Sequence, residues 1–162
     1  MIYYSRIKNI QGYLSDNALD AFLVLTRINR QYLSGFTGST GVVFVSTPSL
    51  ISPLSRGRKR GGRAELYVDD RYIIRAKRES PLGVFPIDKL STYLPPLHLP
   101  LIKGEKIERG QGRRGKVRVG IEDRISLQEF ARLKKDYRGA KWTVTHEVVE
   151  NLRAVKSGLW AA

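Results

Sequence analysis

The chain has 162 residues, a formal net charge of +14 and no cysteine. This length predicts a single domain that is large enough to bury a hydrophobic core. The lack of cysteine excludes a disulfide framework and a thiolate metal site. No apolar stretch approaches the roughly 18 residues of a membrane span, and the first residues show no apolar signal core, so we expect a cytoplasmic protein without a membrane anchor. The scarcity of Asn, Gln and Met, with 27% charged residues, is compatible with a thermophilic source.

A helix and a buried strand are predicted at the start of the chain. Residues 5–16 place Ile7, Ile10 and Leu14 on one helical face. Residues 21–25 form a continuous apolar run, which is typical of a strand that is buried on both faces.

A glycine-rich turn follows. Residues 29–34 predict a short helix, residues 41–46 predict a strand, and three glycines connect them: Gly35, Gly38 and Gly41. A phosphate-binding loop would need a lysine after the last glycine and then a helix, but here a strand follows. The glycines are therefore expected to allow positive φ and close backbone approach, with Phe36 anchoring the turn in apolar surroundings.

The positive charge is concentrated in two glycine-rich runs. Residues 56–63 carry five positive charges and no negative one, and residues 103–118 carry seven positive and two negative charges. Such segments cannot bury apolar surface, so we expect two basic loop insertions over about 53–63 and 103–116. Contact with a phosphate backbone is the alternative, but neither run contains an aromatic residue for base stacking, which argues against nucleic acid as a partner.

The middle of the chain is expected to form a strand, a helix, a second strand and a short helix, over residues 64–69, 70–79, 83–88 and 89–94. In the first of these helices Tyr72, Ile73 and Ala76 recur at helical spacing. Asp69 and Asp70 precede it and are the candidates for its cap.

The last part predicts a strand, a helix, a strand and a helix, over residues 116–122, 126–137, 142–146 and 147–157. Ser126 and Glu129 form a capping box, and Leu127, Phe130 and Leu133 are expected to point inward. Strands that alternate with helices predict a single α/β domain with a mixed sheet flanked by helices.

No catalytic constellation is recognisable from the residues. His98 and His146 have no partners at metal-ligand spacing, and the hydroxyl residues beside the glycines do not form a nucleophile elbow. His146, at the end of a strand, is expected to be a surface or hydrogen-bonded residue. We therefore expect no catalytic residue and no metal ligand in this chain.

Several segments resemble the creatinase/prolidase/aminopeptidase P family. The stretch "NRQYLSGFTGSTG" is similar to a fairly specific block of that family, and "LYVDDRYIIRAKRE", "VRVGIED" and "VVENLRAVKS" are similar to its later blocks. The resemblance runs from Arg6 to Ser157, apart from the two basic insertions. One departure is Asp70, where the family usually has glycine, which suggests a different turn before the helix.

The resemblance covers only the amino-terminal domain of such enzymes and implies its ribonuclease H-like topology. In the family, a separate carboxy-terminal domain brings two Asp, one His and two Glu to a pair of divalent metals. The resemblance therefore implies an amino-terminal domain over residues 1–157, with 158–162 as a truncated linker to an absent catalytic domain, and no cofactor held by this chain.

The resemblance also implies where this domain would act. In the family it supports dimerisation and helps to wall the partner's substrate cleft, so the residues expected to contact the cleft or a partner are Asn29, Arg30, Tyr32 and Phe36. For Tyr32, Leu33 and Phe36, packing of the turn is an equally good alternative.

Three functions remain open. The first is a non-catalytic domain that supports dimerisation and shapes a substrate cleft. It would form a homodimer or associate with a separately encoded catalytic domain, and it would meet a peptide substrate only together with that catalytic domain. The second is a stand-alone peptide- or protein-binding module, and the third is a nucleic-acid-associated protein. We also expect the apolar tail to face water or to pair, namely Leu152, Val155, Leu159 and Trp160.

Overall fold

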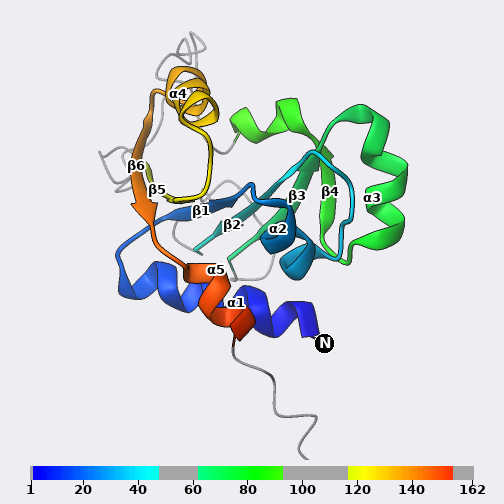
Figure 1. Ribbon diagram of the computed structural model, residues 1–162, viewed down its shortest axis with the longest axis horizontal. Coiled ribbons are helices and arrows are strands. Elements are labelled where there is room, and N and C mark those ends of the chain that lie inside the picture. The colour runs from blue at the N-terminus through cyan, green and yellow to red at the C-terminus, as the bar shows by residue number, and fades with distance from the viewer. Residues whose placement is uncertain (1, 48–61, 93–116, 155–162) are drawn as a thin grey trace, which may run out of the picture.

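The structure is a computed structural model that describes residues 2–47, 62–92 and 117–154 (Figure 1). Its elements follow in the order α1 (Ile2–Asp16), β1 (Ala21–Val24), α2 (Arg27–Ser34), β2 (Val42–Ser46), β3 (Ala64–Val68), η2 (Asp70–Tyr72), α3 (Ile73–Glu79), β4 (Gly83–Pro86), η3 (Ile87–Thr92), β5 (Val117–Glu122), α4 (Leu127–Asp136), β6 (Ala140–Thr145) and α5 (Val148–Ala154). Most of both predicted basic insertions, and the tail after Ala154, lie outside the described residues.

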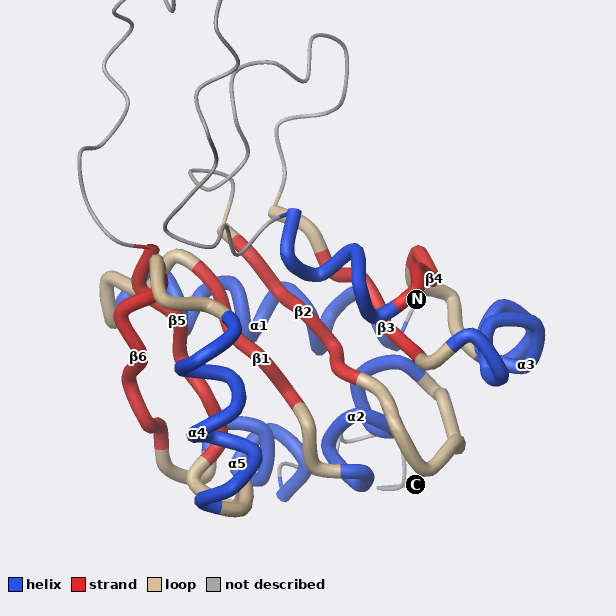
Figure 2. Tube along the Cα trace, turned by 90° about the horizontal axis from the view of Figure 1, so that it is seen from above, coloured by secondary structure: helices blue, strands red, loops and turns tan. Residues whose placement is uncertain are grey.

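The strands form one six-stranded sheet in the order β4-β3-β2-β1-β5-β6. β2 is antiparallel to both β1 and β3, whereas β5 is parallel to β1 and β6 is parallel to β5. β4 extends the other edge, parallel to β3. The predicted α/β fold with a mixed sheet is confirmed, and the antiparallel β1–β2–β3 meander extended beside β1 by parallel strands agrees with the implied ribonuclease H-like topology (Figure 2).

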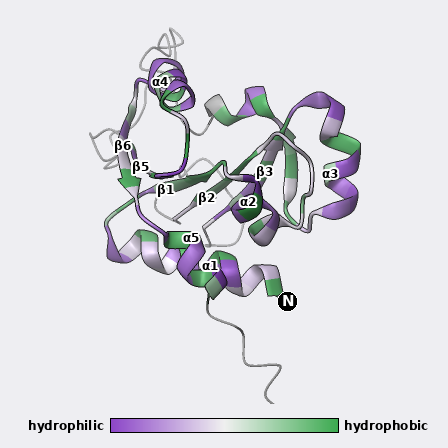
Figure 3. Ribbon diagram, in the orientation of Figure 1, coloured by the Kyte–Doolittle hydropathy of each residue, from purple (hydrophilic) through white to green (hydrophobic). Residues whose placement is uncertain are grey.

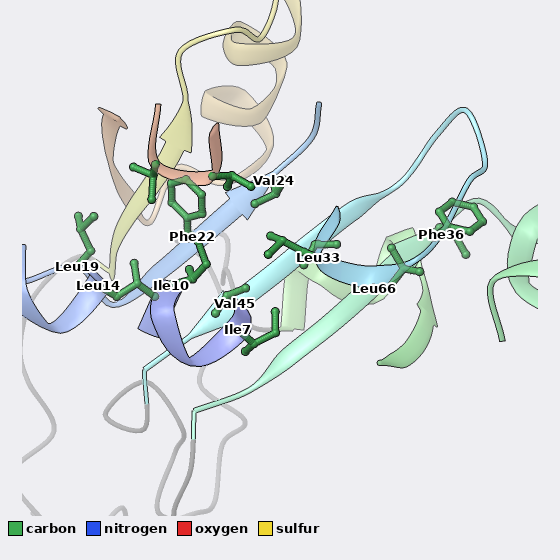
Figure 4. Close-up of a cluster of buried hydrophobic side chains, with 14 of the residues drawn as sticks. Ile7, Ile10, Leu14, Leu19, Phe22, Val24, Leu33, Phe36, Val45 and Leu66 are labelled. Atoms are coloured by element: carbon green, nitrogen blue, oxygen red, sulfur yellow. The ribbon is translucent and has the colours of Figure 1, made fainter. Parts of the chain in front are cut away.

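Two apolar clusters cover the two faces of the sheet. On one face the side chains of α1, α2, α3 and α5 pack against the sheet around Phe22, Val45 and Leu66 (Figure 4). On the other face α4 and η3 cover Leu23 and Phe44. Successive residues of β1 enter opposite clusters, which explains why the whole strand is apolar. The hydrophobic residues of Figure 3 accordingly gather along the central strands, while the helices alternate between hydrophobic and hydrophilic residues.

The first helix follows its sequence pattern. Ile7, Ile10 and Leu14 are all buried, as their spacing predicts. The capping box of α4 is also confirmed, because the Ser126 hydroxyl accepts from the Glu129 amide and the Glu129 carboxylate accepts from the Ser126 amide.

Three local predictions need correction. Leu127 does not point inward: it is 88% exposed, because it is the first residue of α4 and lies before the turns that bring Phe130 and Leu133 against the core. Asp69 alone caps the segment before α3, through the Arg71 amide, and Asp70 is instead the first residue of a 3-10 turn. The short helix predicted at 89–94 is a 3-10 helix that begins at Ile87, and residues 93–94 are outside the described part.

Candidate functional site

The glycine-rich turn between α2 and β2 is held by backbone geometry. Gly35 ends α2 with φ of 75°, and Gly41 enters β2 with φ of 151°, so both have the positive φ that their predicted role requires. Gly38 is small for another reason, because a Cβ there would overlap the ring of Phe36. Phe36 is fully buried and meets Tyr72 edge-on at 6.0 Å between ring centroids, so it anchors the turn as predicted.

Arg30 holds the turn from inside. Its guanidinium donates through Nη1 to the carbonyls of Leu25 and Gly41 at 3.0 and 2.9 Å, and through Nη2 to the carbonyls of Gly38 and Ser39 at 2.6 and 3.0 Å. The side chain is 1% exposed. Burial lowers the pKa of Arg30, repulsion from Arg27 lowers it further, and attraction to Glu122 opposes both. These contacts make Arg30 a structural cation that fixes the path of the turn.

Asn29 is the centre of a second polar cluster, on the side of α2 toward β5. Its Nδ2 lies 2.6 Å from Glu122 Oε1, 2.7 Å from Glu150 Oε1 and 3.1 Å from the Thr26 hydroxyl. Its Oδ1 accepts from Arg153 Nη1 at 2.9 Å. An amide has two N–H donors for these three acceptors, so every donor of Asn29 is used.

Glu122 ends strand β5 and is 4% exposed. Its Oε2 accepts from the backbone amides of Leu25 and Thr26 at 2.7 and 2.8 Å, and its Oε1 accepts from the Thr26 hydroxyl. The carboxylate therefore holds the N-cap residue Thr26 through its amide and places negative charge at the N-terminus of α2.

Tyr32 joins α2 to the helices on either side. Its hydroxyl donates to the Leu152 carbonyl at 3.0 Å. Arg6 lies over its ring at 3.9 Å and donates to its carbonyl at 2.6 Å. Leu152 packs partly buried against the core of its own domain, so the alternative in which it faces water is wrong. The other predicted tail residues are outside the described part.

The outer rim of the turn is polar. Ser39 and Thr40 are exposed, and the Ser39 hydroxyl lies 2.9 Å from the Tyr72 hydroxyl. The Thr37 amide donates to Glu79 Oε2 at 2.8 Å. The hydrogen bond from Arg75, followed by that from the Thr37 amide, lowers the pKa of Glu79.

The structure thus brings all four predicted cleft residues to one helix and its turn but gives them internal partners. Asn29, Arg30 and Phe36 are buried, and Tyr32 is half-buried. None of the first three can touch a ligand at the surface without rearrangement, so any part that they play in a cleft is to position its wall. Contact of these residues with a substrate or partner stays a prediction.

Sequence reasoning did not identify Glu122 and Glu150 as part of this site. Glu122 ends strand β5, and what sets it apart is its burial, which is rare for a carboxylate and is visible only in the structure. Its partners are 93 or more positions away in sequence, so no local pattern identifies them. Glu150 lies on a short amphipathic helix, where a glutamate is common, and gives no signal in the sequence.

Within the described residues no three His, Asp or Glu side chains are grouped so that they could hold a metal ion. The described part of the chain therefore does not fit the two-metal centre that the family resemblance implies for a separate catalytic domain. His146 is exposed and its Nδ1 lies 2.9 Å from Asp123 Oδ2, as expected for a hydrogen-bonded surface histidine. None of the described helices is long and apolar enough to span a membrane.

A groove of about 710 Å³ runs between α1 and the edge of the sheet at β3 and β4. Tyr3, Ile7 and Leu82 form part of its lining, and Gln11 within it donates to the Ser46 carbonyl at 3.2 Å. The residues that line it include no acidic side chain, and it lies apart from the polar cluster around Asn29.

Comparison with known proteins gives one family. The sequence matches the Creatinase/Prolidase N-terminal domain over residues 6–155. No curated protein matches the chain significantly.

Solved structures share the fold at low identity. The XXA-pro aminopeptidase from Streptococcus pyogenes is 20% identical, with 94% of this chain and 98% of that chain covered and a TM-score of 0.64. The N-terminal domain of the cytoplasmic peptidase PepQ from Mycobacterium tuberculosis H37Rv is 24% identical, with 92% and 98% covered and a TM-score of 0.62. The prolidase from Pyrococcus horikoshii OT3 is 20% identical with a TM-score of 0.64, and this chain covers only 36% of it. With residues 6–155 matched to one domain family and its fold shared with these structures, the chain belongs to the Creatinase/Prolidase N-terminal domain family.

Proposed function

We propose that this chain is a non-catalytic, cytoplasmic domain of an Xaa-Pro peptidase-like protein that supports dimerisation and forms part of the wall of a substrate cleft. The cleft itself, the metals and the chemistry would belong to a catalytic domain on another part of the protein or on a separate polypeptide.

The side chains available for chemistry support the non-catalytic part of the proposal. The described residues hold no cluster of metal-ligating side chains, and the two carboxylates of the Asn29 cluster are occupied by internal donors. The chain also spans about a third of the length of the prolidase from Pyrococcus horikoshii OT3, where it covers 36%. We assign hydrolysis to a part of the protein that corresponds to the remaining length.

The turn from Gly35 to Gly41 is the observation that carries the cleft role. Its carbonyls are fixed from inside by Arg30, its ring anchor Phe36 is buried, and its outer rim presents Ser39 and Thr40 to solvent. A wall that must position a peptide needs a rigid backbone with an accessible polar edge, and this turn has both properties.

A peptidase assay tests the proposal that this chain does not hydrolyse peptides by itself. The purified chain is incubated with Xaa-Pro dipeptides and longer Xaa-Pro peptides, with and without Mn²⁺, Co²⁺ or Zn²⁺. We expect no turnover with any metal. Metal-dependent turnover that co-purifies with the chain, and that persists when the chain is made in a host lacking its own Xaa-Pro peptidases, would contradict the proposal.

Photo-crosslinking tests the cleft role. Because the chain contains no cysteine, Thr40→Cys gives a unique attachment point for a photo-reactive group on the rim of the turn. The matched control is Gln128→Cys, which is exposed on α4 on the opposite face of the sheet. In a complex with the catalytic domain, an Xaa-Pro peptide is expected to crosslink to position 40 and not to position 128. Equal labelling, or none at position 40, would refute a cleft role for the turn.

A further inference from the structure

Two successive residues of α2 hold two different parts of the molecule. Asn29 bonds Glu122 at the end of β5 and both Glu150 and Arg153 on α5. Arg30 bonds the carbonyls of the turn that follows the helix. Since adjacent residues of one helix cannot move independently, a displacement of either set of contacts is felt by the other.

The helix α5 packs against α1, α2 and the core of the sheet, and three of its residues form hydrogen bonds with side chains of α2. It has seven residues, from Val148 to Ala154. Val148 and Val149 are buried at its start, and in its second half Leu152 packs against the core. Polar contacts add to this packing: Glu150 and Arg153 bond Asn29, and the Leu152 carbonyl accepts from the Tyr32 hydroxyl.

The joint before α5 stores backbone strain. Glu147 has φ of 52°, a left-handed conformation that costs a non-glycine residue free energy and persists where surrounding contacts impose it. The docked position of α5 therefore depends on its packing against the core and on its hydrogen bonds to α2, rather than on the preference of its own connection.

We propose that α5 acts as a latch: its contacts with Asn29 hold α2 in place, and α2 in turn sets the geometry of the 35–41 turn. The proposal rests on the proposed function, in which this turn faces a substrate cleft and α5 is the last described element before the chain continues to residue 155. Displacement of α5 would then loosen the turn, although α5 and the turn need not contact each other.

Amide hydrogen exchange measured by NMR on the whole chain tests this coupling. The reporters are three amides at the start of the turn: Gly35, which donates to the Gln31 carbonyl, Phe36, which donates to the Ser34 hydroxyl, and Thr37, which donates to Glu79. The acceptors of these three amides all lie outside α5, so a change in their exchange reports transmission through α2.

The unlatched variant is Glu150→Ala combined with Arg153→Ala, which leaves Asn29 its bond to Glu122. We expect the reporter amides to exchange about fivefold faster or more, together with the amides of α5. Tyr32→Phe removes only the hydroxyl that bonds Leu152 and is expected to give a smaller increase at the same amides. The matched control is Asn151→Ala, an exposed residue of the same helix, which should leave the turn unchanged.

A loss of global stability could speed exchange everywhere, so the comparison is made at equal stability. The reference is Ser126→Ala, which destabilises the chain at α4, on the opposite face of the sheet. Urea is added to the more stable of the two variants until their unfolding free energies are equal, and exchange is then compared. If the reporter amides exchange no faster than in this reference, or stay slow while α5 opens, the latch is refuted. No peptide or metal enters this experiment, so its failure leaves the cleft role standing, and failure of the crosslinking test leaves the coupling standing.

Discussion

At the scale of single residues, Arg30 is the group on which the turn depends. A buried guanidinium is costly to desolvate, and four carbonyl acceptors offset that cost. Only the planar fork of arginine reaches all four at once, because a lysine ammonium is a single point with three donors.

Arg30→Lys should therefore lower the free energy of unfolding by about 3 kcal/mol, since buried carbonyls lose charged donors. Arg27→Lys, three positions earlier and exposed, is the matched control and should stay within about 0.5 kcal/mol of the parent. Urea denaturation of both variants measures the difference. Equal stability of the two would show that the turn does not need the guanidinium.

Replacement of glycine by alanine is expected to change the stability of the chain in opposite directions at two positions. Gly38→Ala would push a methyl group into the Phe36 ring and should destabilise the chain by about 2 kcal/mol. Gly12→Ala adds a methyl group with nothing within 4 Å, in the middle of α1, and should stabilise by about 0.5–1 kcal/mol through helix propensity. Thermal unfolding is expected to move in opposite directions for the two variants, and a shift in the same direction would contradict the packing of the turn.

At the scale of elements, the order of helices and strands could be predicted from periodicity and the boundaries could not. The β1 run and the inward face of α1 follow directly from the apolar pattern, because their burial is set by neighbours at fixed spacing. The same pattern wrongly predicts that Leu127 points inward, because the first turn of α4 extends past the surface that its later turns cover.

The candidate site shows the same limit. The helix and its glycines are predictable because their signals are local, and the family resemblance points to Asn29 and Arg30. Their roles were not predictable, because Glu122 and Glu150 reach Asn29 from 93 and 121 positions away. Hydrogen bonds between residues that are far apart in the chain produce no periodic pattern in the sequence.

The N-terminus of α4 gives a prediction at this scale. Ser126→Ala removes the hydroxyl that accepts from the Glu129 amide and bonds the Glu129 carboxylate, and should cost about 1 kcal/mol of unfolding free energy. Leu127→Ala, at the next position, removes a side chain that is 88% exposed and should cost less than about 0.5 kcal/mol. If urea denaturation ranks the two variants in the reverse order, Leu127 is buried in solution.

At the scale of the whole molecule, we assign this domain to assembly and positioning rather than to chemistry. In its described part the buried polar side-chain atoms have partners within the domain, apart from Arg30 Nε and Trp142 Nε1, and the apolar clusters lie on the two faces of the sheet. The proposed function therefore lies at the surface: at the rim of the turn, and at the face that we propose pairs with a second copy. Dimerisation is the part of the proposal that the chain can show by itself.

Sedimentation equilibrium across protein concentration and ionic strength is the most direct test of this claim. Apolar pairing worth about 7 kcal/mol gives a dimer near 10 μM, and salt should strengthen it by screening the net charge of +14. We predict a homodimer under these conditions that Trp160→Ala weakens. A chain that stays monomeric at about 100 μM in high salt would contradict the proposal that this domain dimerises.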